Sequence, residues 1–321
     1  MNNNKTNKFL FKLINEYRSL LILLIMIIVA SFLSSNFMST NNLFNVLRQI
    51  SIFGVVSAGM TFVILTGGID LSVGSIVGLS GVISASVMTA TGSFFMSLVS
   101  GLLVGVVCGF INGYVISSIR IPAFITTLGM MTLLRGIILV FTKGSPISAR
   151  EENFQFIGKG DIFGIPLPVL VLILCFIVGY FILHHTTFGR EVYALGGNRE
   201  ATRLSGIKVV RAEWIVYTIS GLTSALAGVM LAARLGSAQA TAGSGIEMDA
   251  IAAVIIGGTS LSGGSGFILP TVVGAIILGL IDNLLTLMNV NPHATQIVKG
   301  VVILAAVILD KKVNDWAKKI G

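Results

Sequence analysis

Residues 49–119 read QISIFGVVSAGMTFVILTGGIDLSVGSIVGLSGVISASVMTATGSFFMSLVSGLLVGVVCGFINGYVISSI, and Asp70 is the one charged side chain among them. The nearest charges on either side are Arg48 and Arg120. Water-soluble domains carry charged side chains at short intervals on their surfaces, so a gap of 71 residues with a single charge indicates a lipid environment. An ionised carboxylate at the centre of a bilayer costs about 2.5 to 3.5 kcal/mol. We therefore expect Asp70 to lie at a membrane edge or to serve a transport path.

The remainder of the chain has the same character. Of its 321 residues, 54% are apolar, 11% are charged and 37 are glycine, and the mean hydropathy is +0.95. A membrane-crossing helix needs about 20 largely apolar residues, and glycine lets such helices approach closely. The sequence therefore predicts an all-α, polytopic membrane protein with about ten transmembrane helices. The net charge of +8 comes from basic residues beside apolar runs, which favours membrane topology over nucleic-acid binding.

Ten apolar segments are candidate membrane spans. They are residues 19–36, 50–67, 73–91, 94–117, 122–141, 165–184, 213–233, 250–262, 267–288 and 294–309. The eighth segment is too short for a straight crossing, so we expect a broken or re-entrant segment there. Such a segment is tolerated only where protein or a water-filled cavity covers its backbone.

The distribution of basic residues predicts the orientation. Lysine and arginine exceed acidic residues at both ends of the chain and in loop 185–212, but not in loops 142–164 and 234–249. The positive-inside rule then places both termini and loop 185–212 in the cytoplasm and the other two loops outside. The predicted organisation is a cytoplasmic segment (1–18), a transmembrane permease domain (19–309) that carries loop 185–212, and a cytoplasmic tail (310–321).

A nine-residue motif occurs twice. Residues 67–75 read GGIDLSVGS and residues 257–265 read GGTSLSGGS, and six of the nine positions are identical. Each copy interrupts an apolar segment with helix-breaking glycines and with residues that favour helix caps. Transporters build sites near the bilayer midplane from paired, glycine-interrupted segments of this kind. A chance match between two glycine- and serine-rich stretches is the alternative.

The candidate residues of a translocation path or gate come from this repeat and from polar groups within apolar spans. They are Gly67, Gly68, Asp70, Ser72, Asn112, Gly257, Gly258, Ser260, Ser262, Asp282 and Asn283. Asp70 and Ser72 would cap the third span and line the inner end of the path, or Asp70 would only cap a helix at the cytoplasmic boundary. Asn112, Asp282 and Asn283 are more often interhelical hydrogen-bond partners than ligand contacts. We expect Arg135 and Lys299 to reach an interface or to pair with a carboxylate.

The sequence contains no motif of a catalytic chain. It has no G-x-x-x-x-G-K-[ST] phosphate loop, no readable Ser, His and Asp arrangement, and no clustered metal ligands. Cys108 and Cys175 lie within apolar segments and are interpreted as small buried hydrophobic residues. We therefore predict no catalytic residue, no metal site and no cofactor.

The predicted cytoplasmic loop contains a short helix over residues 198–206. Asn198 is a favourable N-cap, Glu200 and Arg203 complement the helix dipole, and Gly206 can end the helix in the left-handed conformation. A helix this short does not persist alone in water, so its apolar face must be covered. It is either an amphipathic linker on the lipid surface or a docking site for a cytoplasmic partner. The candidate docking residues are Gly197, Asn198, Glu200, Ala201, Arg203, Leu204, Ser205, Gly206 and Ile207.

Three motifs taken together resemble the permease subunit of ribose-type ABC sugar importers. They are LTGGIDLSVGS at residues 65–75, the set Gly189-Arg190, Gly197-Asn198 and Arg203-Leu204-Ser205-Gly206-Ile207, and GGTSLSGG at residues 257–264. The resemblance implies a multi-pass protein of the cell membrane in which two copies form the pore. It also implies that cytoplasmic ATPase subunits dock on the 198–206 helix of each copy. An extracytoplasmic binding protein would deliver a monosaccharide, with ribose as the leading candidate.

Two other functions stay open at this point. One is a permease for branched-chain amino acids, whose fold looks similar, and the other is an ion-coupled secondary transporter that uses Asp70. The small number of charges within the spans suits a neutral solute better than an ion or an amino acid. Because the chain lacks a phosphate loop, we expect ATP hydrolysis to take place in a separate partner chain.

Overall fold

The computed structural model describes residues 19–320, and most of these residues are helical. Among them, seven helices are long and apolar enough to cross a membrane: α2 (Thr40–Leu65), α3 (Val73–Thr91), α4 (Phe94–Ser117), α5 (Ala123–Thr142), α7 (Leu167–His185), α10 (Val209–Leu235) and α12 (Ile268–Leu287). The other helices are Ser19–Leu33, α6 (Glu152–Lys159), α8 (Thr187–Gly197), α9 (Arg199–Leu204), α11 (Ile246–Ile256) and α13 (Pro292–Ile320). The described strands form two short antiparallel pairs, β1 (Ile147–Ser148) with β4 (Ser237–Ala238) and β2 (Asp161–Ile162) with β3 (Ile165–Pro166).

The predicted all-α membrane fold is confirmed, and each of the ten predicted spans falls on a helix. The eighth span is short, as expected, because α11 has 11 residues and ends at Ile256, six residues before the predicted limit. The tenth differs at its C-terminal end, because α13 continues as a helix to Ile320 through most of the predicted tail. The predicted segment 1–18 lies outside the described residues.

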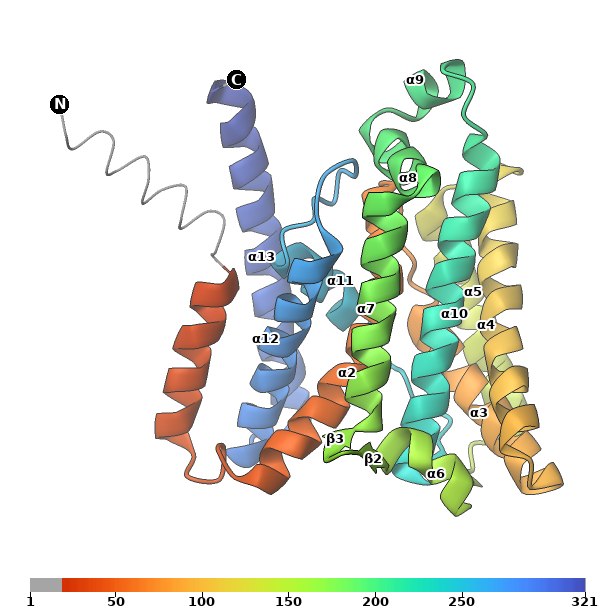
Figure 1. Ribbon diagram of the computed structural model, residues 1–321, viewed down its shortest axis with the longest axis vertical. Coiled ribbons are helices and arrows are strands. Elements are labelled where there is room, and N and C mark those ends of the chain that lie inside the picture. Colours follow the sequence, from red (N-terminus) through yellow and green to blue (C-terminus); the bar gives the residue numbers. More distant parts are fainter. Residues whose placement is uncertain (1–18, 321) are drawn as a thin grey trace.

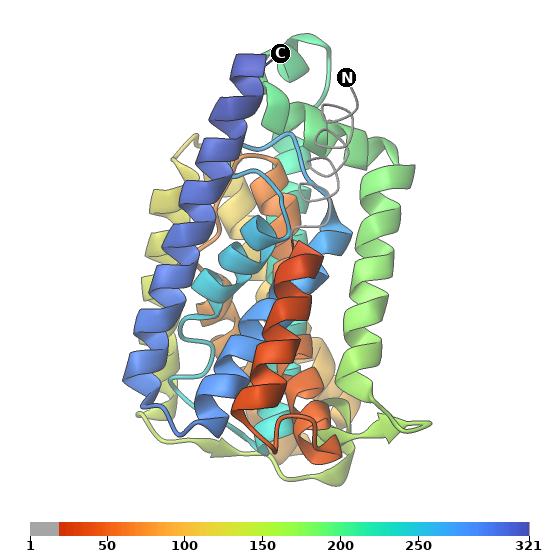
Figure 2. The same cartoon turned by 90° about the vertical axis from the view of Figure 1, so that its left-hand side faces the viewer.

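The helices form a bundle with two distinct ends (Figure 1). Helices α8 and α9 and the C-terminal end of α13 lie at one end, and α6 with the β2–β3 pair lies at the other (Figures 1 and 2). At that second end, β1 pairs with β4, with Ile147 opposite Ala238. The loops that contain β1 and β4 were expected on the same side of the membrane, and their pairing brings them together. Only the first part of loop 234–249 lies there, because the chain then returns into the bundle and begins α11.

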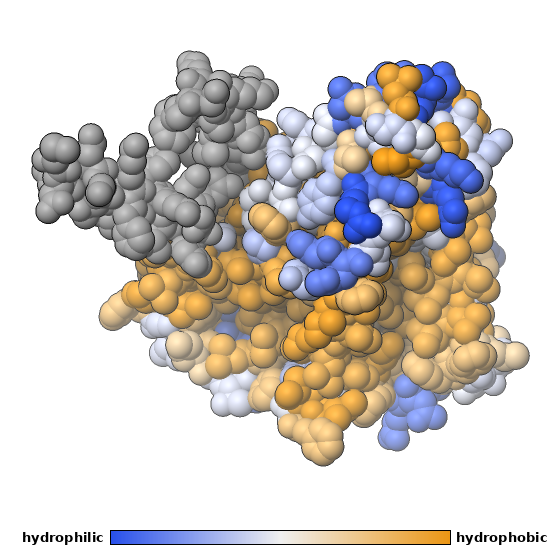
Figure 3. Space-filling view, turned by 45° about the horizontal axis from the view of Figure 1, so that its top comes forward, coloured by the Kyte–Doolittle hydropathy of each residue, from blue (hydrophilic) through white to orange (hydrophobic). Residues whose placement is uncertain are grey.

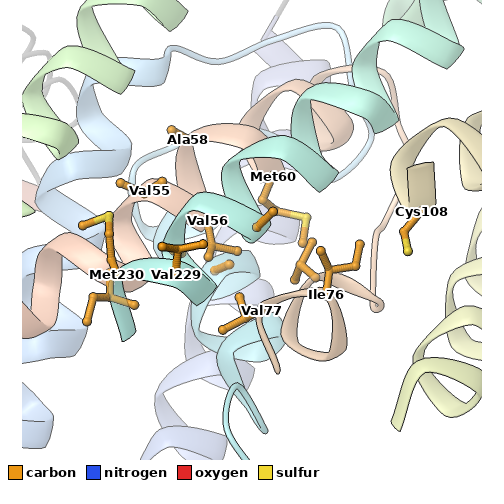
Figure 4. Packing of buried hydrophobic residues seen from close by; sticks show 14 of the residues in the cluster. Val55, Val56, Ala58, Met60, Ile76, Val77, Cys108, Val229 and Met230 are labelled. Carbon is orange, nitrogen blue, oxygen red and sulfur yellow. The ribbon is translucent and has the colours of Figure 1, made fainter. Parts of the chain in front are cut away.

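Helix α10 forms the centre of the main hydrophobic core and packs against α2, α3 and α4. The backbones of α4 and α10 touch, because a Cβ atom at Gly221 would lie 3.0 Å from the Cα atom of Gly109. Figure 4 shows the buried side chains of this core, including Val55 and Met60 of α2, Val77 of α3 and Met230 of α10. Small residues at these crossings let the helices approach in the absence of a water-driven hydrophobic effect.

A second hydrophobic cluster joins the helix Ser19–Leu33 to the first half of α2 and to α11 and α12. Its buried members include Ala30, Phe37, Ile50, Ala253 and Leu278. By contrast, α5 buries only one face, formed by Thr127, Met130, Leu134, Ile138 and Thr142 at intervals of three or four residues. The exposed face of α5 is apolar, as expected for a helix that contacts lipid or another membrane protein.

Candidate functional site

The two copies of the nine-residue motif form two turns that lie against each other. Residues 66–72 connect α2 to α3, and residues 257–267 connect α11 to α12. Gly67 has a φ of +79° and Gly258 a φ of +93°, conformations that side-chain-bearing residues rarely adopt. The amide of Gly264 donates to the carbonyl of Leu65 over 2.9 Å, so the second turn is hydrogen-bonded to the end of α2. Both apolar segments are therefore interrupted where the repeat predicted, and the interruptions meet.

Asp70 lies at the centre of a buried polar network, and its side chain is fully buried. Its Oδ1 accepts hydrogen bonds from the Ser72 amide (3.0 Å) and hydroxyl (2.6 Å), and its Oδ2 accepts one from the Ser220 hydroxyl (2.9 Å) of α10. Ser72 is the residue that precedes α3, yet its hydroxyl makes no capping bond to that helix. The carboxylate thus ties the first turn to α10, at a place that water does not reach in this conformation.

Asn112 of α4 extends the same network. Its side-chain nitrogen donates to the Ser72 hydroxyl over 2.9 Å, and its Oδ1 is buried without a hydrogen-bond partner among the described residues. Gly68 faces Tyr217 of α10, because a Cβ atom at Gly68 would lie 3.4 Å from the Tyr217 ring carbon that bears the hydroxyl. The structure therefore brings Gly68, Asp70, Ser72 and Asn112 together, as interhelical contacts within the bundle.

The second turn is more open than the first. Gly257 packs on α12, where a Cβ atom would lie 2.8 Å from the Thr271 backbone, and Thr259 and Ser260 are buried. Gly258 and Ser262 are exposed, and the Ser262 amide donates to the Ser260 hydroxyl over 3.3 Å. The first turn is buried from Asp70 onward, whereas the second is buried at Ser260 but becomes exposed again at Ser262.

Asp282 and Asn283 of α12 make separate interhelical contacts. Lys299 of α13 forms ion pairs with Asp249 of α11 (2.9 Å) and with Asp282 (2.8 Å), and all three side chains are mostly buried. Asn283 exchanges hydrogen bonds with Asn42 of α2 at 3.0 and 2.7 Å. Lys299 therefore pairs with carboxylates, which is one of the two alternatives expected for it. Asp282 and Asn283 do not join the network around Asp70.

The predicted docking helix is present as α9. The Asn198 side chain accepts from the Ala201 amide over 2.9 Å, and Gly206 has a φ of +84°, so the predicted cap and helix end are both confirmed. Arg203 pairs with Glu200 on the exposed surface, which lowers the pKa of the Glu200 carboxyl. The Leu204 side chain is 72% exposed and Ala201 is exposed too, so nothing in the described chain covers this face.

The N-terminal end of α9 is attached to α10 by an ion pair that no sequence motif indicates. Arg199 donates two hydrogen bonds of 3.0 Å to the two carboxylate oxygens of Glu213, and this contact raises the pKa of the Arg199 guanidinium. Beside this pair lies a groove of about 420 Å³ with five basic residues in its lining: Arg120, Arg199, Arg203, Lys208 and Arg211. In Figure 3, hydrophilic side chains gather at the end of the molecule that carries α8 and α9, above a broad hydrophobic surface.

A further feature without a sequence motif is the non-helical stretch of residues 239–245 that precedes α11. Arg135, near the middle of α5, donates hydrogen bonds to the carbonyls of Ala240 (2.9 Å) and Ala242 (3.0 Å). The irregular backbone therefore lies at the depth of the membrane helices. Arg135 was expected to reach an interface or to pair with a carboxylate, but among the described residues its hydrogen bonds go to these backbone carbonyls. Its isolated charge within an apolar span was the signal of an internal polar partner.

The bundle of long apolar helices defines a multi-pass membrane protein (Figure 1). Residues 42–307 match the family described as Branched-chain amino acid transport system / permease component. The chain belongs to this family. It is the permease subunit of an ABC importer, a transport component rather than an enzyme, and its ATPase is a separate subunit.

Several relatives are similar over nearly the whole chain. The ribose import permease protein of Escherichia coli (strain K12) is 47% identical over 301 residues, which cover 92% of this chain and 94% of that protein. The ribose import permease protein of Bacillus subtilis (strain 168) is 47% identical over 292 residues, or 90% and 91% of the two chains. The L-arabinose transport system permease protein of Escherichia coli (strain K12) is 39% identical over 297 residues, or 92% and 90%. No solved structure matches the chain.

Proposed function

We propose that this permease imports a monosaccharide and that ribose is its substrate. The observation that carries the proposal is the 44–47% identity to ribose import permeases over nine-tenths or more of the chain. The next relatives are named for L-arabinose, another five-carbon sugar, and their identity is lower. The ion-coupled alternative does not fit, because the chain is the permease subunit of an ABC importer, whose energy source is ATP hydrolysis in a separate subunit.

The exposed face of α9 is the proposed docking site for the ATPase. Leu204 and Ala201 offer a small apolar contact, and the basic groove beside them suits an acidic surface on the partner. A bidentate Arg199–Glu213 pair connects the base of α9 to α10, which crosses the bundle. With the ATPase docked there, α8, α9 and the C-terminal end of α13, which lie at the same end of the bundle (Figures 1 and 2), would face the cytoplasm, the side that the distribution of basic residues predicts for loop 185–212.

Two copies of the chain are proposed to enclose the sugar path. Gln239, Thr241 and Ser244 are exposed on the non-helical stretch 239–245. Irregular backbone at membrane depth is tolerated only where protein covers it or where it lines a water-filled cavity. A second copy against this face provides such an enclosure, and the side-chain amide and hydroxyl groups suit the hydroxyls of a sugar. An open apolar groove of about 1000 Å³ runs along α5, where Gly129 and Gly136 leave room for close helix packing.

Reconstitution tests the substrate assignment. The permease, its ATPase and its binding protein are placed in proteoliposomes, and uptake of radiolabelled ribose, L-arabinose and leucine is measured with and without ATP. We expect ATP-dependent uptake of ribose, weaker uptake of L-arabinose and none of leucine. Leucine uptake that exceeds ribose uptake would overturn the sugar assignment. Ribose uptake by the permease alone, driven by an ion gradient, would overturn the need for the ATPase.

Cysteine accessibility tests the proposed path. In a variant that lacks Cys108 and Cys175, Thr241→Cys is compared with Leu174→Cys, which replaces an exposed side chain on α7. A membrane-impermeant thiol reagent should modify the Thr241→Cys protein at least tenfold faster, because water reaches a path but not the lipid face. Equal, slow modification of both variants would show that residues 239–245 do not line a path.

A further inference from the structure

The last turn of α8 lies directly on the junction between the two broken segments. The hydrogen bond from the Gly264 amide to the Leu65 carbonyl joins the second turn to the end of α2. Gly196 of α8 packs on this bond, because a Cβ atom at Gly196 would overlap both the Leu65 carbonyl oxygen and the Gly264 nitrogen. Three segments that are far apart in the sequence therefore meet at one point, with no side chain between them.

The neighbouring contacts have the same character. A Cβ atom at Gly263 would lie 2.7 Å from the Gly67 nitrogen, and one at Gly264 would lie 2.7 Å from the Gly197 nitrogen. The Tyr193 hydroxyl, one turn earlier on α8, donates to the Gly266 carbonyl over 2.9 Å. Backbone contacts cannot be relieved by side-chain rotation, so a displacement of α8 is passed on to both turns.

Helix α8 is also joined to the proposed docking helix without an intervening loop. Asn198 ends α8, where its amide donates to the Ala194 carbonyl over 3.0 Å, and it begins α9 through its side chain. Movement of α9 is therefore transmitted to α8. Gly196 lies two residues before Asn198, at the only position in the last turn of α8 where a Cβ atom would overlap both α2 and the second turn.

We propose that Gly196 is a positioning residue for transport: it seats α8 on the Leu65–Gly264 hydrogen bond, so that movement of the docked ATPase displaces both broken segments together. This inference rests on the proposed docking of the ATPase at α9. Gly196 itself contacts neither the ATPase nor the sugar. Its contribution is to keep the end of α8 in direct backbone contact with the two turns, so that a movement of α9 reaches them without loss.

The test uses Gly196→Ala in the complete reconstituted importer, with Ala194→Ser as the matched control. Both changes add one heavy atom to the end of α8, but Ala194 is exposed and lies on roughly the opposite face of the helix. We expect Gly196→Ala to bind the ATPase with unchanged affinity and to retain ATP hydrolysis. Ribose uptake should fall at least tenfold, so the number of ATP molecules hydrolysed per sugar rises by a similar factor. Ala194→Ser should show the wild-type ratio.

Tyr193→Phe provides a milder second variant in case Gly196→Ala does not fold. It removes only the hydroxyl that donates to Gly266, and we expect the ATP-to-sugar ratio to rise about twofold. An unchanged ratio in every variant that folds, or loss of ATPase binding together with uptake, would overturn the proposal. A wild-type complex that neither binds the ATPase nor imports sugar would instead overturn the proposed function.

Discussion

The two turns of the repeat differ most at the fourth position of the motif. The first turn has Asp70 there, buried and hydrogen-bonded to α10, and the chain continues directly into the buried start of α3. The second turn has Ser260, and after it the chain stays non-helical and partly exposed until α12 begins at Ile268. Similar sequences therefore produce a fixed turn in the first half and a more open turn in the second.

The buried acidic residues of the two halves of the chain are also stabilised differently. In the described structure, Asp70 accepts hydrogen bonds from neutral serine groups and forms no ion pair, whereas Asp249 and Asp282 share the ammonium group of Lys299. The ion pairs hold α11 to α12 and α13 even though the turn that follows α11 is open. The comparison teaches that the stability of the second half depends on ion pairs that lie away from its turn. The stability of the first half depends on hydrogen bonds within the turn itself.

The largest effect is expected from Lys299→Met. Removal of the ammonium group leaves two mostly buried carboxylates without a counter-charge, and breaking a buried pair in this way costs about 3–5 kcal/mol. The free energy of unfolding in mixed detergent micelles measures the loss. Lys299→Arg keeps the positive charge and should lose much less. A loss below about 1 kcal/mol for Lys299→Met would show that the second half does not depend on these pairs.

A loss of similar size is expected from Asp70→Leu. The Ser72 and Ser220 hydroxyls would lose their acceptor, and each buried unsatisfied polar group costs about 1–3 kcal/mol. Asp70→Asn keeps one oxygen acceptor and should lose about half as much in the same unfolding assay. Ser262→Ala at the exposed second turn is the control and should change the unfolding free energy by less than about 0.5 kcal/mol. Equal losses at the two turns would remove the distinction between them.

Leu204→Asp should change binding without changing the fold. The side chain is exposed on α9, so unfolding should be unaffected, but the added charge should weaken ATPase binding at least tenfold, or about 1.4 kcal/mol. Titration of the purified ATPase into detergent-solubilised permease measures the affinity. Phe163→Asp, which changes an exposed residue beside the β2–β3 pair at the opposite end, should leave this affinity unchanged. Unchanged affinity in Leu204→Asp would exclude this face as the docking site.

The smallest effect is expected from pH at α9. Arg203 lowers the pKa of Glu200 in the folded protein, so their pair stabilises α9 above the unfolded pKa of Glu200, near 4.5. The stabilisation is lost as the pH falls through the folded pKa. The affinity for the ATPase should therefore vary less than twofold between pH 6 and pH 8. The ratio of wild-type to Glu200→Gln affinity should also vary less than twofold over this range. A steep change within that range would mean that another group controls docking.

Features set by neighbouring residues were predictable from the sequence. The uncharged runs indicated the spans, the paired glycine motifs indicated the breaks, and Asn198 and Gly206 indicated the limits of α9, because caps and turns depend on a few adjacent residues. The sequence did not indicate Ser220 as the partner of Asp70, 150 residues away, or Glu213 as the partner of Arg199. Both partners are ordinary polar residues, and only helix packing brings them into contact.

The sequence alone determined that this chain crosses a membrane many times, that two of its apolar segments are interrupted, and that it carries no phosphate loop, because hydropathy, glycine content and motif spacing are local properties. The tertiary structure decided that the two interruptions meet each other and the end of α8, and that Asp70 is buried rather than at an open boundary. Those outcomes depend on how closely helix backbones approach. Such approaches are determined by contacts between residues far apart in the chain, which no local pattern records.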